Sequence, residues 1–117
     1  MKLVKSLLAA SAISGLLMTT GVADAALIAQ GEKIFNSKKS GNCLACHAIT
    51  GKNIKDPGSF GPDLAMVASY PDDLLYEMIY DIYTAKGLKI SAMPAFGKNG
   101  WMDDQEIKAV VAYLKSK

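Results

Sequence analysis

The sequence predicts a small all-α domain of three to four short helices. Apolar residues recur at helical spacings in three segments: residues 26–36, the segment from Asp72, and the segment after Asp103. Residues 50–63 are polar and contain glycine and proline, which disfavours a helix or a central strand there. Residues 26–117, 92 in number, suit one small domain with a limited core.

Residues 1–25 have the features of a secretory signal peptide. Two lysines among the first five residues precede an apolar run, residues 7–18, and Ala23-Asp24-Ala25 offers a small-residue cleavage site. The run is about a dozen residues long, whereas a bilayer span needs about twenty. Cleavage is therefore favoured over a retained anchor, and no stable membrane insertion is expected. The mature chain would begin near Ala26 and function in the periplasm.

The mature chain is nearly neutral. Without Lys2, Lys5 and Asp24, the 13 lysines and 11 acidic residues of the sequence become 11 and 10, a net charge of +1. A nucleic-acid-binding protein would show a basic face or stripe. No nucleic-acid partner is therefore expected.

The pentapeptide Cys43-Leu44-Ala45-Cys46-His47 has the spacing that covalent attachment of a c-type haem requires. Each of the two thiols can form a thioether to one vinyl group of a haem. The histidine directly after the second cysteine then becomes the proximal ligand of the iron. The sequence thus predicts one covalent haem c held by Cys43, Cys46 and His47.

Three other interpretations of the cysteine pair were weighed against haem attachment. A structural zinc site needs four protein ligands, and the chain has no other cysteine or histidine, so two carboxylates would have to complete it. A thioredoxin-like dithiol expects a βαβ context, and nothing strand-like flanks the pair. A structural disulfide would close a four-residue loop and so remove little chain entropy. Haem attachment is favoured over all three.

The turn Gly61-Pro62-Asp63-Leu64 offers a partner for the ligating histidine. A proline has no N–H, so the Pro62 carbonyl can accept a hydrogen bond without belonging to a helical ladder. A histidine that binds a metal needs such an acceptor for its other ring nitrogen. Without the haem motif, an ordinary turn would be the favoured interpretation.

The amino-terminal helix, predicted over residues 26–36, contains Gly31. A glycine costs a helix about 1 kcal/mol relative to alanine. A close crossing by another helix would explain a glycine at this position. A glycine that is merely tolerated on the surface is an equally good explanation.

The carboxyl-terminal helix is predicted to run from a capping box at Asp103 to about Lys115. Its apolar face consists of Ile107, Val110, Val111 and Leu114. Tyr113 lies beside this face and is the aromatic residue expected to meet Gly31 and Phe35.

A further helix is predicted to follow Tyr70-Pro71, with two acidic residues in its first turn and a stop near Gly87. Its apolar stripe consists of Leu74, Leu75, Met78, Ile79 and Ile82.

Met93 is the favoured second axial ligand. Other roles are available to four of the six methionines: Met1 and Met18 leave with the signal, Met78 belongs to a helical stripe, and Met102 precedes a helix cap. Of Met66 and Met93, the latter lies in an aperiodic loop before Pro94, which favours an extended backbone. A loop methionine well separated from His47 can reach the opposite face of a haem. Met66 is the alternative.

The whole mature chain resembles class I cytochrome c. The resemblance is carried by a Gly-x-x-x-Phe helix at residues 31–35, the haem pentapeptide, Gly-Pro-x-Leu at 61–64, Met93-Pro94, and Val-Ala-Tyr-Leu at 111–114. It implies a small all-α cytochrome fold around one haem, with His47 and Met93 as axial ligands and Pro62 and Leu64 at the haem. One-electron transfer is the function it implies.

More narrowly, the sequence is similar to the small monohaem X subunit of the thiosulfate-oxidising Sox complex, L-cysteine S-thiosulfotransferase. The similar stretches are residues 41–47, 61–64, 70–71, 79–81 and 93–100. In that family a larger haem-containing subunit carries the catalytic cysteine, and the X subunit accepts its electrons. The resemblance implies a heterodimer with such a subunit, a redox protein as acceptor, and no catalytic residues in this chain.

Two other functions stay open. The first is a freely diffusing cytochrome that serves a respiratory chain, which would lack a permanent subunit interface. The second is a haem sensor or small-molecule binder with an open sixth coordination position, which would require that Met93 does not bind the iron.

Overall fold

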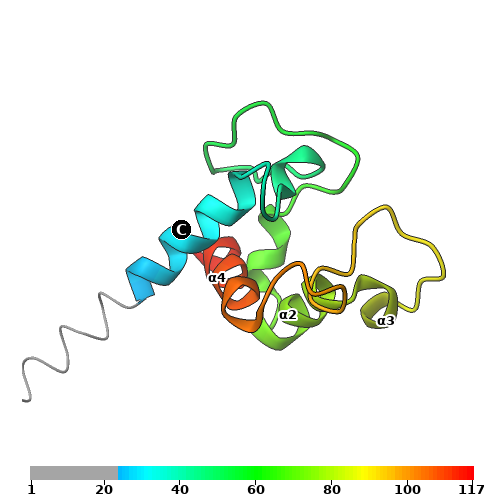
Figure 1. The fold of residues 1–117 in the computed structure, drawn as a ribbon. Helices are drawn as coiled ribbons and strands as arrows, with labels where there is room; N and C mark the ends of the chain where they lie inside the picture. Colours follow the sequence, from blue (N-terminus) through cyan, green and yellow to red (C-terminus); the bar gives the residue numbers. More distant parts are fainter. Residues whose placement is uncertain (1–23) are drawn as a thin grey trace, which may run out of the picture.

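The computed structural model describes residues 24–117 of the 117-residue chain. Within this range the chain forms helices and no strand, which confirms the predicted all-α class (Figure 1). The predicted signal peptide falls mostly on residues 1–23, outside the described residues, and stays a prediction. Within the described part, no helix combines the length and the apolar character that crossing a bilayer requires.

Residues 24–36 form a helix, here called the amino-terminal helix. Its end agrees with the predicted boundary. The structure also has two short 3-10 helices that the sequence did not predict: the first lies within the haem pentapeptide and the second directly follows the Gly-Pro turn. The further elements are η1 (Cys43–Ala45), η2 (Ala65–Ser69), α2 (Asp72–Tyr80), α3 (Ile82–Lys86) and α4 (Asp104–Lys115).

Helix α4 begins at the predicted capping box. The Asp103 carboxylate accepts a hydrogen bond from the Glu106 backbone N–H at 2.8 Å, and the Glu106 carboxylate accepts one from the Asp103 N–H at 3.0 Å. The two bonds satisfy backbone donors that a helix start would otherwise leave unpaired. The residues that α4 buries include all four predicted apolar positions: Ile107, Ala109, Val110, Val111, Tyr113 and Leu114.

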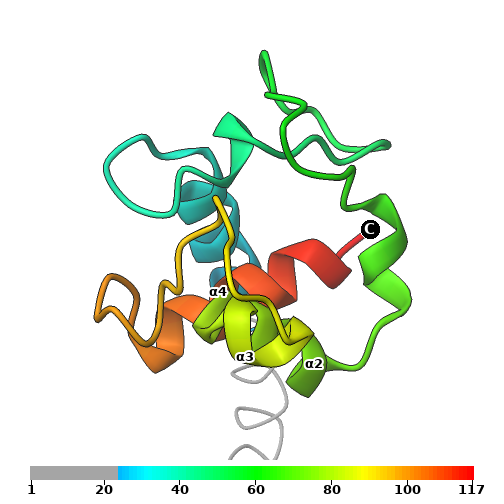
Figure 2. The ribbon, with the colours of Figure 1, turned by 90° about the vertical axis from the view of Figure 1, so that its right-hand side faces the viewer.

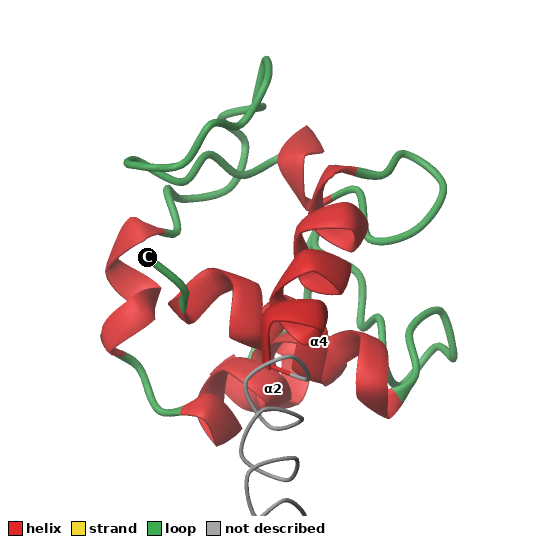
Figure 3. Ribbon diagram, turned by 90° about the vertical axis from the view of Figure 1, so that its left-hand side faces the viewer, coloured by secondary structure: helices red, strands yellow, loops and turns green. Residues whose placement is uncertain are grey.

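The amino-terminal helix crosses α4 at Gly31 (Figure 3). A Cβ atom at this position would collide with the Ala109 carbonyl and would lie only 2.8 Å from Tyr113 Cβ. One turn later, the rings of Phe35 and Tyr113 pack with their centroids 5.6 Å apart. The close crossing predicted from the glycine is therefore confirmed, and the alternative of a tolerated surface glycine is wrong.

Helix α2 packs against the same core through Leu75 and Ile79. The two residues are buried as predicted, whereas Leu74 leaves 40% of its surface exposed and does not belong to the buried stripe. Met78 is half-buried against the core, and Met102 is buried within it.

The predicted single helix from Asp72 to Gly87 is broken in the structure. Asp81 takes an extended conformation, φ −155° and ψ 91°, and separates α2 from α3. Its carboxylate accepts hydrogen bonds from the backbone N–H groups of Tyr83 and Thr84, so it starts a new helix instead of continuing the old one. The predicted stop is confirmed, because Gly87 ends α3 in the left-handed conformation at φ 63°.

Two long loops extend beyond these helices. Residues 50–64 follow the haem pentapeptide, and residues 87–102 connect α3 to α4; Figure 1 shows both on the side away from the start of the amino-terminal helix, and Figure 2 views them from that side. The loops carry the Gly-Pro turn and Met93, so the packed helices serve as their support.

Replacing Gly31 by valine should destabilise the fold by about 1 to 3 kcal/mol, because the added carbons must fit against the Ala109 carbonyl. Urea unfolding of the two proteins measures the difference. Ala29→Val, at an exposed position of the same helix, is the matched control for valine's weaker helix propensity. Equal unfolding midpoints for Gly31→Val and this control would contradict the prediction.

Candidate haem site

The haem pentapeptide folds as one short turn. Asn42, in the left-handed conformation at φ 50°, precedes η1. The Cys43 carbonyl then accepts hydrogen bonds from the backbone N–H groups of Cys46, at 3.2 Å, and His47, at 2.9 Å. This turn holds both thiol-bearing residues and the histidine in one local unit, as attachment to a single ring requires.

A second segment, residues 58–64, lies along the pentapeptide and is held to it by backbone hydrogen bonds. The contacts are Gly58 N–H to Leu44 O at 2.8 Å, Gly61 N–H to Cys46 O at 2.8 Å, and Leu64 N–H to Ala48 O at 2.9 Å. Together they fix the Gly-Pro turn relative to the cysteines, and they place Leu64 beside the motif, where it is half-buried against the core.

The ring of His47 is oriented by the Gly-Pro turn. Its Nδ1 atom lies 2.8 Å from the Pro62 carbonyl oxygen, so the hydrogen bond expected from the sequence is present. A carbonyl oxygen can only accept, so Nδ1 must carry a proton, and in the neutral ring Nε2 then keeps its lone pair. The structure thus holds His47 in the tautomer whose Nε2 can bind a metal. The role of Pro62 as a haem-binding residue stays a prediction.

Two glycines make this close approach possible. At Gly61, a Cβ atom would collide with the His47 ring, lying 2.7 Å from Nδ1 and 3.0 Å from Nε2. At Gly58, a Cβ atom would collide with the Ala45 carbonyl. Any side chain at either position would push the turn away from the pentapeptide or rotate the imidazole.

Asp63 closes the loop between the pentapeptide and the Gly-Pro turn. Its carboxylate accepts hydrogen bonds from the Thr50 hydroxyl and from the backbone N–H of Ala65 at 2.8 Å. The Thr50 hydroxyl bond, followed by the bonds from the Ala65 and Thr50 N–H groups, holds the pKa of Asp63 below its ordinary value. The carboxylate is therefore ionised at neutral pH and stays available as an acceptor.

The Cys43 thiol does not have the properties of a redox-active or metal-binding thiolate. Both cysteines are free, which excludes the disulfide interpretation for this structure. Burial, with a smaller contribution from the neighbouring Cys46, raises the pKa of the Cys43 thiol to about 11. Reactive and metal-binding thiols instead have lowered pKa values. Within residues 24–117, no three histidine, cysteine or acidic side chains are grouped to hold a metal ion.

Met93 lies on the other loop, half-buried, and its backbone N–H donates to the Ser91 hydroxyl at 3.1 Å. The Ser91 carbonyl in turn accepts from the Tyr83 hydroxyl at 2.9 Å, which ties the loop to α3. Met66 instead leaves 77% of its surface exposed on η2. Met78 and Met102 pack in or against the core, as their predicted roles require.

The structure thus brings together five of the six predicted site residues, whereas the sixth, Met93, lies on a different loop. Cys43, Cys46, His47, Pro62 and Leu64 form one hydrogen-bonded unit. Among the described residues, no hydrogen bond connects this unit to the loop of Met93. Such a separation is compatible with axial ligands, which approach an iron from opposite faces of a porphyrin and do not touch each other.

Sequence reasoning missed three supporting residues: Gly58, Asp63 and Tyr83. Gly58 lies in the polar loop before the Gly-Pro turn and Asp63 lies within that turn, but the sequence predicts no contact for either. The spacing Asp63-x-Ala65 after a proline is an Asx-turn signal that could have identified the carboxylate. No sequence signal identifies the contact of the Tyr83 hydroxyl with Ser91.

Comparison with known families identifies the type of domain. Residues 26–114 match the family described as cytochrome c oxidase, cbb3-type, subunit III. The chain belongs to this family. It is a cytochrome c domain that binds haem iron and transfers electrons. A comparison with curated proteins finds no match.

The residues present in this cytochrome fit a haem. The pentapeptide supplies two free thiols at the spacing of the two vinyl groups, and the Nδ1 bond to Pro62 leaves Nε2 of the neutral His47 ring available to a metal. The Pro62 carbonyl supplies the acceptor that a metal-bound imidazole needs on its other nitrogen.

Gly61→Ala should lower the fraction of the cytochrome that carries correctly ligated haem, because the new methyl group must displace the His47 ring. The visible spectrum and the haem content per chain measure the effect. Gly51→Ala is the matched control: it lies in the same loop at φ 95°, so the substitution strains the backbone, but nothing lies within 4 Å of the added carbon. An equal loss in both variants would show that loop strain alone, without the imidazole contact, accounts for the effect.

Proposed function

We propose that this cytochrome is a periplasmic one-electron carrier with one covalent haem c, whose axial ligands are His47 and Met93. The observation that carries the proposal is the hydrogen bond of His47 Nδ1 to the Pro62 carbonyl, which leaves Nε2 free to bind iron. When bound, the haem supplies an iron that alternates between the ferrous and ferric states. The protein does no covalent chemistry on a substrate.

The two ligands would contribute differently to the reduction potential. The Pro62 carbonyl accepts a hydrogen bond from Nδ1–H and so raises the basicity of the imidazole. A neutral thioether opposite imidazole stabilises ferrous iron and raises the potential. The thioether of Met93 is therefore the group that makes the protein an electron acceptor, and its half-buried position limits contact with water.

Met93→Ala should abolish the weak absorption band near the red edge of the spectrum that iron–thioether bonding produces. It should also open the sixth position to carbon monoxide and lower the potential, since axial ligands move haem potentials over a range of about 0.8 V. Met66→Ala, the matched control on η2, should leave all three properties unchanged. Reversed results would transfer the ligand role to Met66; no change in either variant would overturn His and Met ligation.

We further propose that the electrons come from oxidative coupling of thiosulfate to a carrier-protein cysteine, with this chain as the small cytochrome subunit of a Sox complex. The support is the resemblance across residues 41–47, 61–64, 70–71, 79–81 and 93–100. These stretches include the Gly-Pro turn and the Met93 loop, and also residues 79–81, where α2 ends. The partner would be a larger haem-containing subunit, and a redox protein would accept the electrons.

A free respiratory shuttle is the second candidate. The family description, which names a subunit of a cytochrome c oxidase, favours a respiratory role; it does not distinguish a free protein from a bound subunit. A shuttle and a subunit would use the same haem chemistry. They differ in whether the protein stays bound in one heterodimer or diffuses between an electron donor and an acceptor.

Purification of the native protein from its source should yield a complex with a larger haem-containing chain. The intact mass of the smaller chain should equal residues 26–117 plus one haem that acid and organic solvent do not remove. Isolation as a monomer at every salt concentration, with the same mass, would favour the shuttle. A mass without haem would contradict covalent attachment.

A further inference from the structure

One carboxylate of the protein is buried outside the haem site. Asp81 leaves 7% of its surface exposed and is the only buried polar or charged residue within residues 24–117. Burying an ionised carboxylate is costly unless partners replace the water it loses. The partners of Asp81 therefore indicate what the buried charge holds in place.

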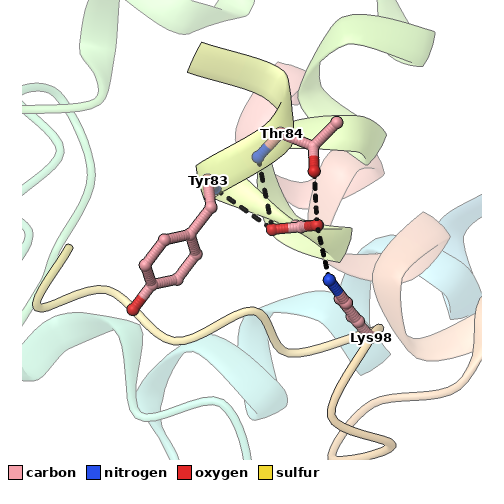
Figure 4. Close-up of polar contacts among 4 residues, drawn as sticks. Tyr83, Thr84 and Lys98 are labelled. Atoms are coloured by element: carbon pink, nitrogen blue, oxygen red, sulfur yellow. Dashed lines mark hydrogen bonds and ion pairs between the residues drawn. The ribbon is translucent and has the colours of Figure 1, made fainter. Parts of the chain in front are cut away.

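Four contacts converge on the Asp81 carboxylate, three from α3 and one from the loop after Met93 (Figure 4). The backbone N–H groups of Tyr83 and Thr84 donate at 3.1 and 3.4 Å, and the Thr84 hydroxyl donates at 2.7 Å. The ammonium group of Lys98 lies 3.7 Å away. The Thr84 hydroxyl bond, more than any other contact, holds the pKa of Asp81 below its ordinary value, so the group is charged at neutral pH.

Residues 87–102, here called the methionine loop, leave α3 and return to α4, and the part before Met93, the outgoing arm, is attached to α3. The Tyr83 hydroxyl donates to the Ser91 carbonyl, and the Ser91 hydroxyl accepts from the Met93 N–H. The same Tyr83 gives its backbone N–H to Asp81. The carboxylate thus fixes the residue whose side chain holds the loop two positions before Met93.

The returning arm of the methionine loop is attached at the same place. The backbone N–H groups of Gly97 and Lys98 both donate to the Tyr80 carbonyl, at 3.1 and 3.0 Å. A Cβ atom at Gly97 would collide with the Tyr80 ring, so this approach is as close as the backbone allows. The Lys98 side chain then reaches Asp81, the residue next to Tyr80.

A helix cap alone does not account for this arrangement. Capping explains the bonds from Tyr83 and Thr84, which satisfy the first N–H groups of α3. It does not explain why the carboxylate is buried or why it pairs with a lysine 17 positions later. The parts of the methionine loop before and after Met93 both contact residues 80–84, and the charged Asp81 side chain belongs to that segment.

We propose that Asp81 is a positioning residue for the sixth ligand: it fixes both arms of the methionine loop and thereby sets how Met93 approaches the iron. The inference rests on the proposed ligation by Met93. It assigns to the break between α2 and α3 a role in electron transfer, although no side chain at the break touches the haem site described above. The reduction potential should therefore depend on Asp81.

The test uses the haem-loaded protein and compares two pairs of variants. Asp81→Ala removes the cap and the charge, and Asp103→Ala removes the equivalent cap of α4 as its control. Lys98→Ala removes only the ion pair with Asp81, and Lys108→Ala is its control, since Lys108 is an exposed lysine paired with Asp104 on α4. Asp81→Asn keeps a capping oxygen but removes the charge.

The readouts are the iron–thioether band, the reduction potential, and hydrogen exchange at the Met93 amide. Asp81→Ala should weaken the band, lower the potential, and raise the exchange rate about tenfold or more, the effect of losing hydrogen bonds to a charged group. Lys98→Ala and Asp81→Asn should change all three in the same direction but less, because Lys98 is largely exposed. The two controls should leave all three at the values of the parent.

The proposal is overturned if Asp81→Ala matches Asp103→Ala in all three readouts, or, should Asp81→Ala fail to fold, if Lys98→Ala and Asp81→Asn both match Lys108→Ala. Failure of the proposed function looks different: the parent itself would then lack the iron–thioether band. In that case the exchange rates would still decide whether Asp81 holds the loop.

Discussion

The hydrogen bond from His47 Nδ1 to the Pro62 carbonyl is the contact on which the haem site depends. It fixes the protonation of the ring, and the three backbone bonds between residues 44–48 and 58–64 fix the geometry of the bond itself. Gly58 and Gly61 allow the two segments to approach so closely. The electronic state of one imidazole nitrogen is thus determined by a backbone arrangement that extends over about twenty residues.

The methionine loop is held by interactions of a different kind from those around His47. The methionine loop is held by a buried charge, a tyrosine hydroxyl and the carbonyl at the end of α2. Charge-assisted contacts of this kind are strong only while both partners stay in place. The break in the predicted helix therefore has a use: a continuous helix through Asp81 would keep the carboxylate away from the N–H groups it now accepts from.

Local signals in the sequence were sufficient for the helices and for most of the site. The capping box at Asp103 and the glycine at position 31 each report a backbone requirement of their own segment, so α4 and the helix crossing could be predicted. The break at Asp81 could not, because the apolar stripe continues through Ile82, which is buried as a single helix would also require. At the end of α2 the Asp81 carboxylate accepts hydrogen bonds from Tyr83 and Thr84 and pairs with Lys98, and periodicity carries no information about these contacts.

The same limit applies to the residues that support the ligands. Pro62 was identifiable because a proline carbonyl next to a haem motif has few other uses, whereas Tyr83 contacts Ser91 only through a loop conformation that no pattern encodes. Asp63 was not predicted, although its spacing to Ala65 is a recognised turn signal that could have identified it.

The contacts that support each ligand are short-range in the sequence. His47 and Pro62 are 15 positions apart, and Tyr83 and Ser91 are 8 apart, so each support closes only a small loop at a modest entropic cost. The crossing of Gly31 with Ala109 instead joins the two ends of the domain. With the proposed ligands, the coordination sphere of the iron would be modular. Mutation of residues 80–99 would alter the sulfur side and leave the imidazole side unchanged, while the terminal helices keep both parts in one molecule.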